Sequence, residues 1–256
     1  MKQYNGEKYI VSFTSFGERL KKIGKCIYVL TTQSYKNFHP VLTIFKEDEK
    51  YLTDDVKLFI DNDLVEVIIA DEDLGPHLKY YYTMKKYNDK PIITVDDDRM
   101  YHKDMLKWLI NKYETIKYKS IISNCAIEIQ KRGSKILPYP NWIPHKLQAD
   151  RTSIFAMAEG FAGVLYPPKC FDNFATQEFH DGILACKYDD DLYLKVQGIK
   201  NKVPVTQSSH MIKYTENDNM KDLMQYNLHN NQNKGDTNRV NMCYKFEKEL
   251  LIAWCV

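Results

Sequence analysis

The sequence predicts an α/β fold in which a mostly parallel central sheet carries helices on both faces. Short apolar runs, rich in β-branched residues, alternate with helical patterns from residue 8 to residue 124. This alternation is typical of units in which a helix returns the chain to the next parallel strand. After residue 125 the alternation becomes irregular, so we expect a less regular C-terminal part.

Each expected element depends on its own local pattern. Apolar residues at helical spacing indicate helices, and short apolar runs bounded by polar residues indicate strands. Gly75-Pro76 is expected to open a further helix, because proline is tolerated in the first helical turn. We expect strands at 8–15, 39–45, 65–70, 92–95 and 203–206, and helices at 17–33, 54–62 and 103–117.

The second half divides into a folded part and a tail. Residues 131–152 contain three prolines and are expected to form loops. Residues 216–238 are polar and rich in asparagine, which predicts a mobile segment. Residues 240–256 carry apolar side chains at helical spacing, which predicts an amphipathic helix. We therefore expect one domain with halves at 1–124 and 125–215, followed by a tail at 216–256.

Composition excludes several classes of protein. The chain of 256 residues has 36 basic and 34 acidic side chains, which argues against a nucleic-acid binder with a basic stripe. Its six cysteines form no CxxC pair and no zinc-type spacing, so we expect buried, reduced thiols. An N-terminal signal peptide and a run long enough to span a membrane are both missing from the sequence, which predicts a cytoplasmic protein.

Three consecutive carboxylates, Asp96–Asp98, directly follow the strand expected at 92–95. Adjacent acids at the end of a buried strand repel one another and lose solvation unless a cation lies among them. A hard divalent metal is the obvious cation, and open α/β sheets bind ligands beyond the carboxyl ends of their strands. A solvated acidic turn that ends the strand is the alternative interpretation.

A second acidic triplet, Asp189–Asp191, opens the pattern Leu192-Tyr193-Leu194-Lys195-Val196. At a helix N-terminus the backbone dipole favours an ionised carboxylate, which could act as a general base. The competing interpretation is capping of the helix by one of the aspartates. One residue could do both.

The order of these segments resembles a GT-A-fold glycosyltransferase over roughly residues 8–200. Val95-Asp96-Asp97-Asp98 resembles the DxD motif that binds a metal and a diphosphate. The segment 188–195 resembles the ED-x-D-L-x-L-R motif of inverting family 2 enzymes, but has Tyr188 instead of Glu and Lys195 instead of Arg. The resemblance gives the role of catalytic base to Asp189, with Asp190 and Asp191 as alternates.

Three further segments resemble parts of the same family. Val11–Ser15 with Arg19 resembles the strand and loop that hold the nucleoside, and Gly75-Pro76 with Lys79 resembles a GP-x-x-K segment that faces the nucleotide. Residues 160–167 resemble the glycine-containing segment beside donor and acceptor. The resemblance implies nucleotide-sugar binding by Thr14, Ser15, Arg19, Lys79, Asp96, Asp97, Gly160 and Gly163, and metal binding by Asp96, Asp98 and His210.

The resemblance also implies an activity. We expect Mn²⁺- or Mg²⁺-dependent transfer of a sugar from a nucleotide-diphospho-sugar, expected to be a UDP-sugar, to a glycan or lipid-linked acceptor, with inversion. The setting implied is synthesis of bacterial capsule, O-antigen or other surface polysaccharide, at the inner face of the plasma membrane. A retaining GT-A transferase, a nucleotidyltransferase and a catalytically inactive sugar- or nucleotide-binding subunit are the alternatives. The nucleotidyltransferase usually carries a Gly-rich phosphate loop near its N-terminus, which this sequence lacks.

Two regions have an open role at this stage. Tyr139, Trp142 and His145 lie where such enzymes build acceptor sites, and ordinary packing is the alternative. The C-terminal helix could lie on a membrane interface, or pack on the domain or on a second copy of the chain.

Overall fold

A computed structural model describes residues 6–116, 119–144, 150–208 and 236–255. Its centre is an eight-stranded sheet in which every strand except β10 and β12 points the same way, as the pairing of neighbours shows. The prediction of a mostly parallel sheet is confirmed. In spatial order the strands are β10 (Thr152–Ser153), β13 (Val205–Gln207), β5 (Ile121–Ser123), β12 (Val164–Tyr166), β4 (Ile92–Thr94), β1 (Tyr9–Thr14), β2 (Phe38–Phe45) and β3 (Glu66–Ala70).

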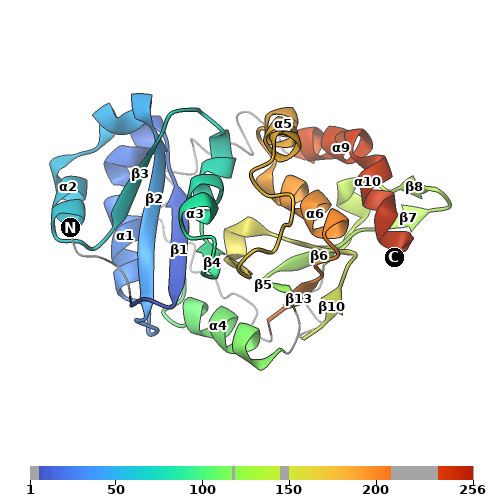
Figure 1. Cartoon of the computed structure of the whole chain (residues 1–256), viewed down its shortest axis with the longest axis horizontal. Coiled ribbons are helices and arrows are strands. Elements are labelled where there is room, and N and C mark those ends of the chain that lie inside the picture. Colours follow the sequence, from blue (N-terminus) through green and yellow to red (C-terminus); the bar gives the residue numbers. More distant parts are fainter. Residues whose placement is uncertain (1–5, 117–118, 145–149, 209–235, 256) are drawn as a thin grey trace.

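Helices cover both faces of this sheet (Figure 1). Neighbouring strand residues point to opposite faces, so Ile92 belongs to one hydrophobic core and Ile93 to the other. The first core is shared with α3 (Tyr81–Lys86) and α6 (Asp190–Lys200), and the second with α1 (Gly24–Thr31), α2 (Asp54–Asp61) and α4 (Met105–Thr115). Burial on both faces explains why these strands are almost continuously apolar.

Most elements of the first half lie where the sequence predicts them. The helix expected at 17–33 begins as a 3₁₀ turn, η1 (Gly17–Lys22), before α1, and the helix expected after Gly75 is divided into η3 (Gly75–Lys79) and α3. A further 3₁₀ turn, η2 (Lys46–Tyr51), follows β2. The Asp189 side chain caps α6 by accepting a hydrogen bond from Leu192 N at 3.2 Å, so the capping prediction is confirmed.

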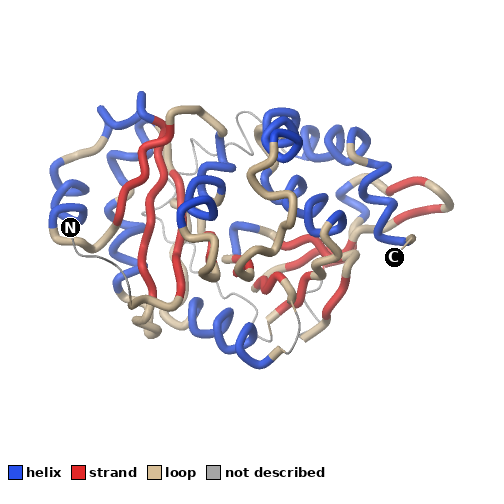
Figure 2. Tube along the Cα trace, in the orientation of Figure 1, coloured by secondary structure: helices blue, strands red, loops and turns tan. Residues whose placement is uncertain are grey.

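The second half is built from short pieces, which Figure 2 shows as brief strands separated by loops. A three-stranded sheet contains β6 (Ala126–Glu128), β9 (Ile143–Pro144) and β11 (Ala156–Ala158), and β7 (Lys131–Arg132) pairs with β8 (Lys135–Ile136). The helix α5 (Gln177–Ala185) begins at Thr176, whose hydroxyl accepts a hydrogen bond from Phe179 N. The sheet therefore extends past residue 124, and both predicted halves contribute strands to it.

The predicted C-terminal helix is divided into α9 (Asp236–Lys245), α10 (Glu247–Leu251) and η6 (Ile252–Trp254). Its side chains Cys243, Phe246, Leu250 and Ala253 are buried in the first core, so this end of the chain packs on the domain. None of the helices described here combines the length and the apolar character that crossing a membrane requires. His210 and residues 216–235 of the segment that we predicted to be mobile lie outside the described residues.

Four of the six cysteines are buried, Cys125 is half-buried and Cys255 is exposed. All six are free thiols, as the sequence predicts.

Candidate active site

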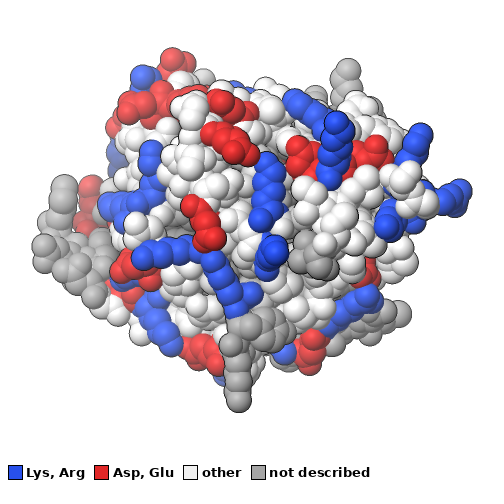
Figure 3. Space-filling view, turned by 45° about the vertical axis from the view of Figure 1, so that its right-hand side comes forward, with Lys and Arg blue, Asp and Glu red and all other residues white. Residues whose placement is uncertain are grey.

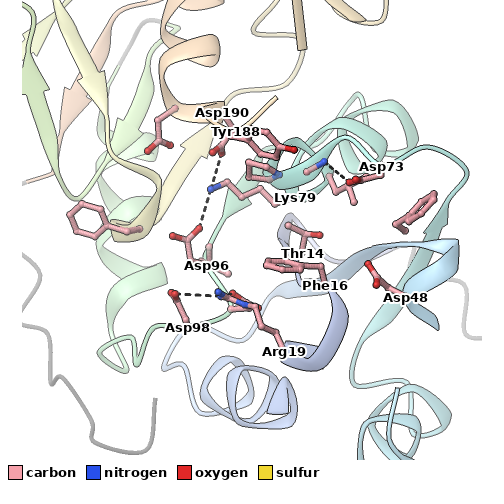
Figure 4. A pocket seen from close by; sticks show the side chains of 18 of the residues that line it. Thr14, Phe16, Arg19, Asp48, Asp73, Lys79, Asp96, Asp98, Tyr188 and Asp190 are labelled. Atoms are coloured by element: carbon pink, nitrogen blue, oxygen red, sulfur yellow. Dashed lines mark hydrogen bonds and ion pairs between the residues drawn. The ribbon is translucent and has the colours of Figure 1, made fainter. Parts of the chain in front are cut away.

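A cavity of about 880 Å³ opens at the carboxyl ends of β1 and β4. Its size is in the range of small-molecule sites, and its place at the strand ends is where open α/β sheets bind ligands. Residues of both predicted halves line it (Figure 4). Of the predicted site residues the lining includes Thr14, Arg19, Lys79, Asp96, Asp97, Asp98, Asp190 and Asp191, whereas it does not include Ser15, Gly160, Gly163 or Asp189.

Arg19 is one of the cations that contact the first acidic triplet. Its Nε donates to Asp97 Oδ2 at 3.0 Å, one of its terminal nitrogens pairs with Asp97 Oδ1, and the same nitrogen lies 3.4 Å from Asp98 Oδ2. Burial disfavours the charge of Arg19, but the charge and hydrogen bond of Asp97 together with the charges of Asp98 and Asp96 outweigh burial and raise the pKa of the guanidinium above its ordinary value. A fork-shaped, permanently charged side chain is therefore held at the floor of the cavity.

Lys79 joins the two acidic triplets. Its Nζ lies 3.0 Å from Asp96 Oδ1 and 2.8 Å from Asp190 Oδ2, and Figure 4 shows it between the two carboxylates. Burial opposes its charge, but Asp190 and Asp96 outweigh burial and raise its pKa. The charge of Lys79 lowers the pKa of Asp190 against the opposing effect of burial. Both groups are therefore ionised at neutral pH.

The carboxylates of the first triplet are only partly compensated by these cations. Burial raises the pKa of Asp98, and the charges of Asp96 and Asp97 raise it further, although Arg19 and Arg99 oppose them. A bound cation would relieve this excess negative charge. Within the described ranges there is no group of three or more His, Cys, Asp or Glu side chains that could hold a metal ion alone. Asp96 and Asp98 nevertheless fit a divalent ion that takes its other ligands from phosphate and water.

The three carboxylates of the second triplet have different surroundings. Asp189 is 2% exposed, and Arg239 on α9 donates to both of its oxygens, each at 2.8 Å. Asp189 also caps α6, so its carboxylate is fully occupied by the fold. Asp190 is paired with Lys79. Asp191 faces the cavity.

Asp191 has an environment that favours its protonated form. Its Oδ1 accepts a hydrogen bond from Gly160 N at 3.0 Å, and its Oδ2 lies 3.4 Å from Arg239 Nη2. Burial raises its pKa to about 7, and the charge of Asp190 contributes to the increase. A carboxylate with a pKa near 7 is suited to take up and release a proton at neutral pH.

Two glycines fit this site closely. A Cβ atom on Gly160, in η5 (Gly160–Ala162), would lie 2.6 Å from Asp191 Oδ1 and 2.9 Å from Lys79 Nζ. Gly160 is therefore needed for the approach of two charged side chains to the backbone. Gly163 has a φ of +85°, which favours glycine, and it packs against Met105 rather than into the cavity.

The cavity has an aromatic and acidic end beside the carboxyl ends of β1 and β2. Phe16, Phe45 and Tyr51 line it together with Asp48 and Asp73. Asp73 accepts a hydrogen bond from Gly75 N at 2.9 Å, and Asp48 accepts one from Gly17 N at 3.1 Å. Rings of this kind can stack on a flat heterocycle, and carboxylates can accept hydrogen bonds from its N–H groups.

The opposite end of the cavity is lined mainly by residues of the second half of the chain. Tyr139 in η4 (Tyr139–Asn141) donates a hydrogen bond to Glu159 at 2.8 Å, and the Arg99 guanidinium lies 5.4 Å from the ring centre of Phe161. Trp142 is buried and donates from Nε1 to Leu137 O, so it belongs to the packing of the fold. His145 lies outside the described residues.

The remaining predicted residues differ in their contacts. Thr14 Oγ1 donates to Thr43 O at 2.7 Å, which ties the end of β1 to β2. Ser15 is buried, and its hydroxyl has no hydrogen-bond partner within the described part of the chain. Lys195 is also buried and donates to Ile154 O, away from the cavity.

Arg239 is among the cavity residues that no sequence motif identifies. It lies 50 residues beyond Asp189, after a polar segment without a motif. A signal was nevertheless present, because the chain has only five arginines. Three of them, Arg19, Arg99 and Arg239, line this one cavity.

Basic and acidic side chains are mixed over the face shown in Figure 3. This distribution agrees with the net charge of +2.

Comparison with known proteins gives a fold but no family. No family model and no curated protein matches the sequence. The fold is similar to residues 1–349 of S. aureus TarS, with a TM-score of 0.52 and 13% identity, covering 86% of this chain and 64% of that one. The same TarS fragment in complex with UDP-GlcNAc aligns with a TM-score of 0.49 and 15% identity, covering 84% and 60% of the two chains. The mannosyltransferase PcManGT from Pyrobaculum calidifontis, in complex with GDP-Man and Mn²⁺, aligns with a TM-score of 0.47 and 12% identity, covering 80% and 58%.

The chain thus spans slightly less than two thirds of the TarS fragment. At this identity the similarity concerns the fold, and it confirms the predicted GT-A type.

Proposed function

We propose that this chain is a glycosyltransferase that moves a sugar, with inversion, from a nucleotide-diphospho-sugar to a hydroxyl group of a glycan or lipid-linked acceptor. One observation carries the proposal. A single cavity holds a cluster of cations and carboxylates at the end of β4, and a carboxylate with a pKa of about 7 at the start of α6. The first group suits a diphosphate, and the second suits removal of a proton from an attacking hydroxyl.

The donor would lie along the β1–β4 edge. Arg19 and Lys79 offer charge-assisted hydrogen bonds to its diphosphate. A divalent ion held by Asp96 and Asp98 would supply neutralisation of the negative charge that develops on the departing diphosphate. The aromatic and acidic end of the cavity would take the nucleobase, and a uracil N–H could donate to the carboxylate of Asp73 or Asp48. We therefore propose a UDP-sugar as the donor.

The proton would go to Asp191. As the acceptor oxygen forms its bond to the anomeric carbon, Asp191 takes the hydroxyl proton, and the bond from that carbon to the diphosphate oxygen breaks. Asp190 is a weaker base because Lys79 lowers its pKa. Asp189 has both oxygens occupied by Arg239 and lies outside the cavity lining. We therefore propose Asp191, an alternate in the family resemblance, as the base in place of Asp189.

A screen of nucleotides by thermal unfolding tests the donor half of this proposal. A ligand that binds the native state raises Tm by mass action. We expect UDP to raise Tm, and Mn²⁺ to enlarge the increase, relative to GDP and CDP. If none of these diphosphates changes Tm with or without Mn²⁺, the chain is not a nucleotide-sugar enzyme.

The anomeric configuration of the product, read by NMR, tests the reaction half. Inversion is expected, because Asp191 acts as a base toward the acceptor. A product that retains the donor configuration would identify the retaining class, which does not need that base. Binding of nucleotide without any transfer or donor hydrolysis would indicate an inactive binding subunit.

The proposed cellular setting is surface-polysaccharide synthesis at the inner face of the bacterial plasma membrane. The C-terminal helices support only a limited contact there, since most of their apolar side chains pack on the domain. Tyr244 and Ile252 are the exposed large side chains of this tail. A membrane or second copy of the chain would meet the tail through them.

A further inference from the structure

Arg239 is held on three sides by groups that come from different parts of the chain. Its guanidinium donates to both oxygens of Asp189, lies 3.4 Å from Asp191 Oδ2, and stacks 4.8 Å from the ring centre of Tyr139. The side chain is 21% exposed, and it lines the same cavity as Asp191. Lysine cannot reproduce this combination of contacts, in which a planar guanidinium pairs with a carboxylate and stacks on a ring.

The pairing with Asp189 restricts what Asp189 can do. Both of its oxygens accept charge-assisted hydrogen bonds from Arg239, and one of them also caps α6 through Leu192 N. These three bonds hold the Asp189 carboxylate in place at the start of α6 as part of the fold. Without Arg239 the partner left to this buried carboxylate, among the residues that the structure describes, would be the backbone N–H of Leu192.

The contact of Arg239 with Asp191 is weaker, because it is longer and involves one oxygen. The charged and titratable groups that face Asp191 are Asp189 and Asp190 on its own helix, Lys79 on η3, Arg239 on α9, and Tyr166 on β12. The two acids raise its pKa, whereas Lys79 and Arg239 lower it. Lys79 is shared with Asp190 and Asp96, and Arg239 is the second positive charge that lowers the pKa of Asp191.

We propose that Arg239 is a positioning residue that divides the work of the second triplet, holding Asp189 as a structural cap and keeping Asp191 turned to the cavity as the base. This inference depends on the proposed function, since it concerns the proton transfer of that reaction. It assigns a role in the transferase site to α9, which carries no motif of the family that the sequence resembles. Arg239 itself exchanges no proton.

The test compares Arg239→Gln and Arg239→Lys with the wild type. Lys245→Gln is the matched control, because Lys245 lies on the same helix, donates to Ala185 O at 2.9 Å and does not line the cavity. Transfer is measured as kcat against pH with a UDP-sugar donor, and UDP binding is measured by calorimetry. Thermal unfolding of all variants shows whether α9 still folds.

We expect Arg239→Gln to bind UDP within about 2-fold of the wild type and to lose about 10–100-fold in kcat, within the range of positioned acid–base catalysis. The limb of the pH profile where activity rises with pH should move to higher pH, because a positive charge that lowered the pKa of Asp191 is gone. Arg239→Lys should restore the position of that limb but only part of kcat. Lys245→Gln should match the wild type.

Several results would overturn the inference. An Arg239→Gln profile that coincides with the wild type would show that Arg239 does not act on the base. An equal loss in Lys245→Gln would show a general effect of the tail. If the wild type transfers sugar but the Arg239 variants do not show the expected changes in kcat and pH profile, the proposed function stands and the inference fails. If the wild type neither binds a nucleotide nor transfers a sugar, both fail.

Discussion

The two acidic triplets have the same sequence, Asp-Asp-Asp, but different surroundings. Asp96–Asp98 follow a strand, and their carboxylates contact cations of the first half that include Arg19 in η1 and Lys79 in η3. Asp189–Asp191 begin a helix, where successive side chains are turned by about 100°. They therefore point to three places: to Arg239, to Lys79 and to Gly160.

This difference in geometry separates a charge-holding site from a proton-transfer site. In the first triplet the acids share a small volume, so they act together on one cation or on the charges of one ligand. In the second triplet the nearest partners of the three acids differ; burial raises the pKa of Asp191 to about 7, whereas the charge of Lys79 lowers the pKa of Asp190. Environments that separate the pKa values of neighbouring acids are the usual way to assign their roles.

The strongest test of this separation is Asp191→Asn. The amide can still accept the hydrogen bond from Gly160 N, but it cannot take a proton. We expect transfer to fall by about 10²–10⁴-fold, the range for loss of a general base, while UDP binding is retained. Steady-state transfer and calorimetry measure the two quantities.

Asp181→Asn is the control, because Asp181 is an exposed acid on α5 whose partner is Gln177. Turnover of Asp191→Asn close to that of this control would remove Asp191 from the mechanism.

Gly160→Ala would disturb the contact between the two triplets. The added Cβ would overlap Asp191 Oδ1 and Lys79 Nζ, which lie 2.6 and 2.9 Å from its position. Because small displacements of reacting groups are costly, we expect a loss of about 10²-fold in kcat. Overpacking should also lower the free energy of unfolding by about 1–3 kcal/mol.

Activity and denaturant unfolding measure these effects. Gly6→Ala is the control, since nothing lies within 4 Å of a Cβ at that position. A Gly160→Ala protein with normal kcat would show that the site tolerates movement of Asp191.

Asp98→Asn tests the first triplet without changing its shape. It removes a negative charge and a metal ligand, so UDP should bind in the absence of Mn²⁺ at least as well as to the wild type. The increase in UDP affinity that Mn²⁺ produces should fall by about 10–100-fold, the range typical of mutating a residue that supports a metal site. Calorimetry with and without Mn²⁺ gives both numbers.

Asp61→Asn, at the exposed end of α2, controls for the change in net charge. An undiminished effect of Mn²⁺ in Asp98→Asn would exclude Asp98 as a ligand.

How far the sequence predicts this molecule depends on the range of the interactions involved. The strands β1 to β4 and their helices follow from local apolar patterns that are long enough to be distinct. The strands β6 to β11 have two or three residues each, so pairing with distant segments decides them. The helix α5 begins at a Thr cap that the sequence contains but that no long apolar period follows.

The candidate site shows the same limit. Motifs were sufficient to find Arg19, Lys79 and both triplets, because these residues are close to a strand end or a helix start. Motifs could not assign separate roles to the three aspartates of the second triplet. The assignment depends on Arg239, which lies 50 residues beyond Asp189 in the sequence and contacts it because α9 packs beside α6.

Asp189→Asn is expected to have the smallest effect, and it distinguishes the structure from the motif most directly. Asparagine caps a helix about as well as aspartate, so α6 should keep its N-terminus. Loss of a negative charge near Asp191 lowers the pKa of Asp191, and Arg239 becomes free to approach it. We expect kcat within about 10-fold of the wild type, well below the loss of up to about 10⁴-fold that removal of a general base produces. The rising limb of the pH profile should move to lower pH, opposite to its shift in Arg239→Gln. A fall in transfer as large as that of Asp191→Asn, with UDP binding intact, would return the role of base to Asp189.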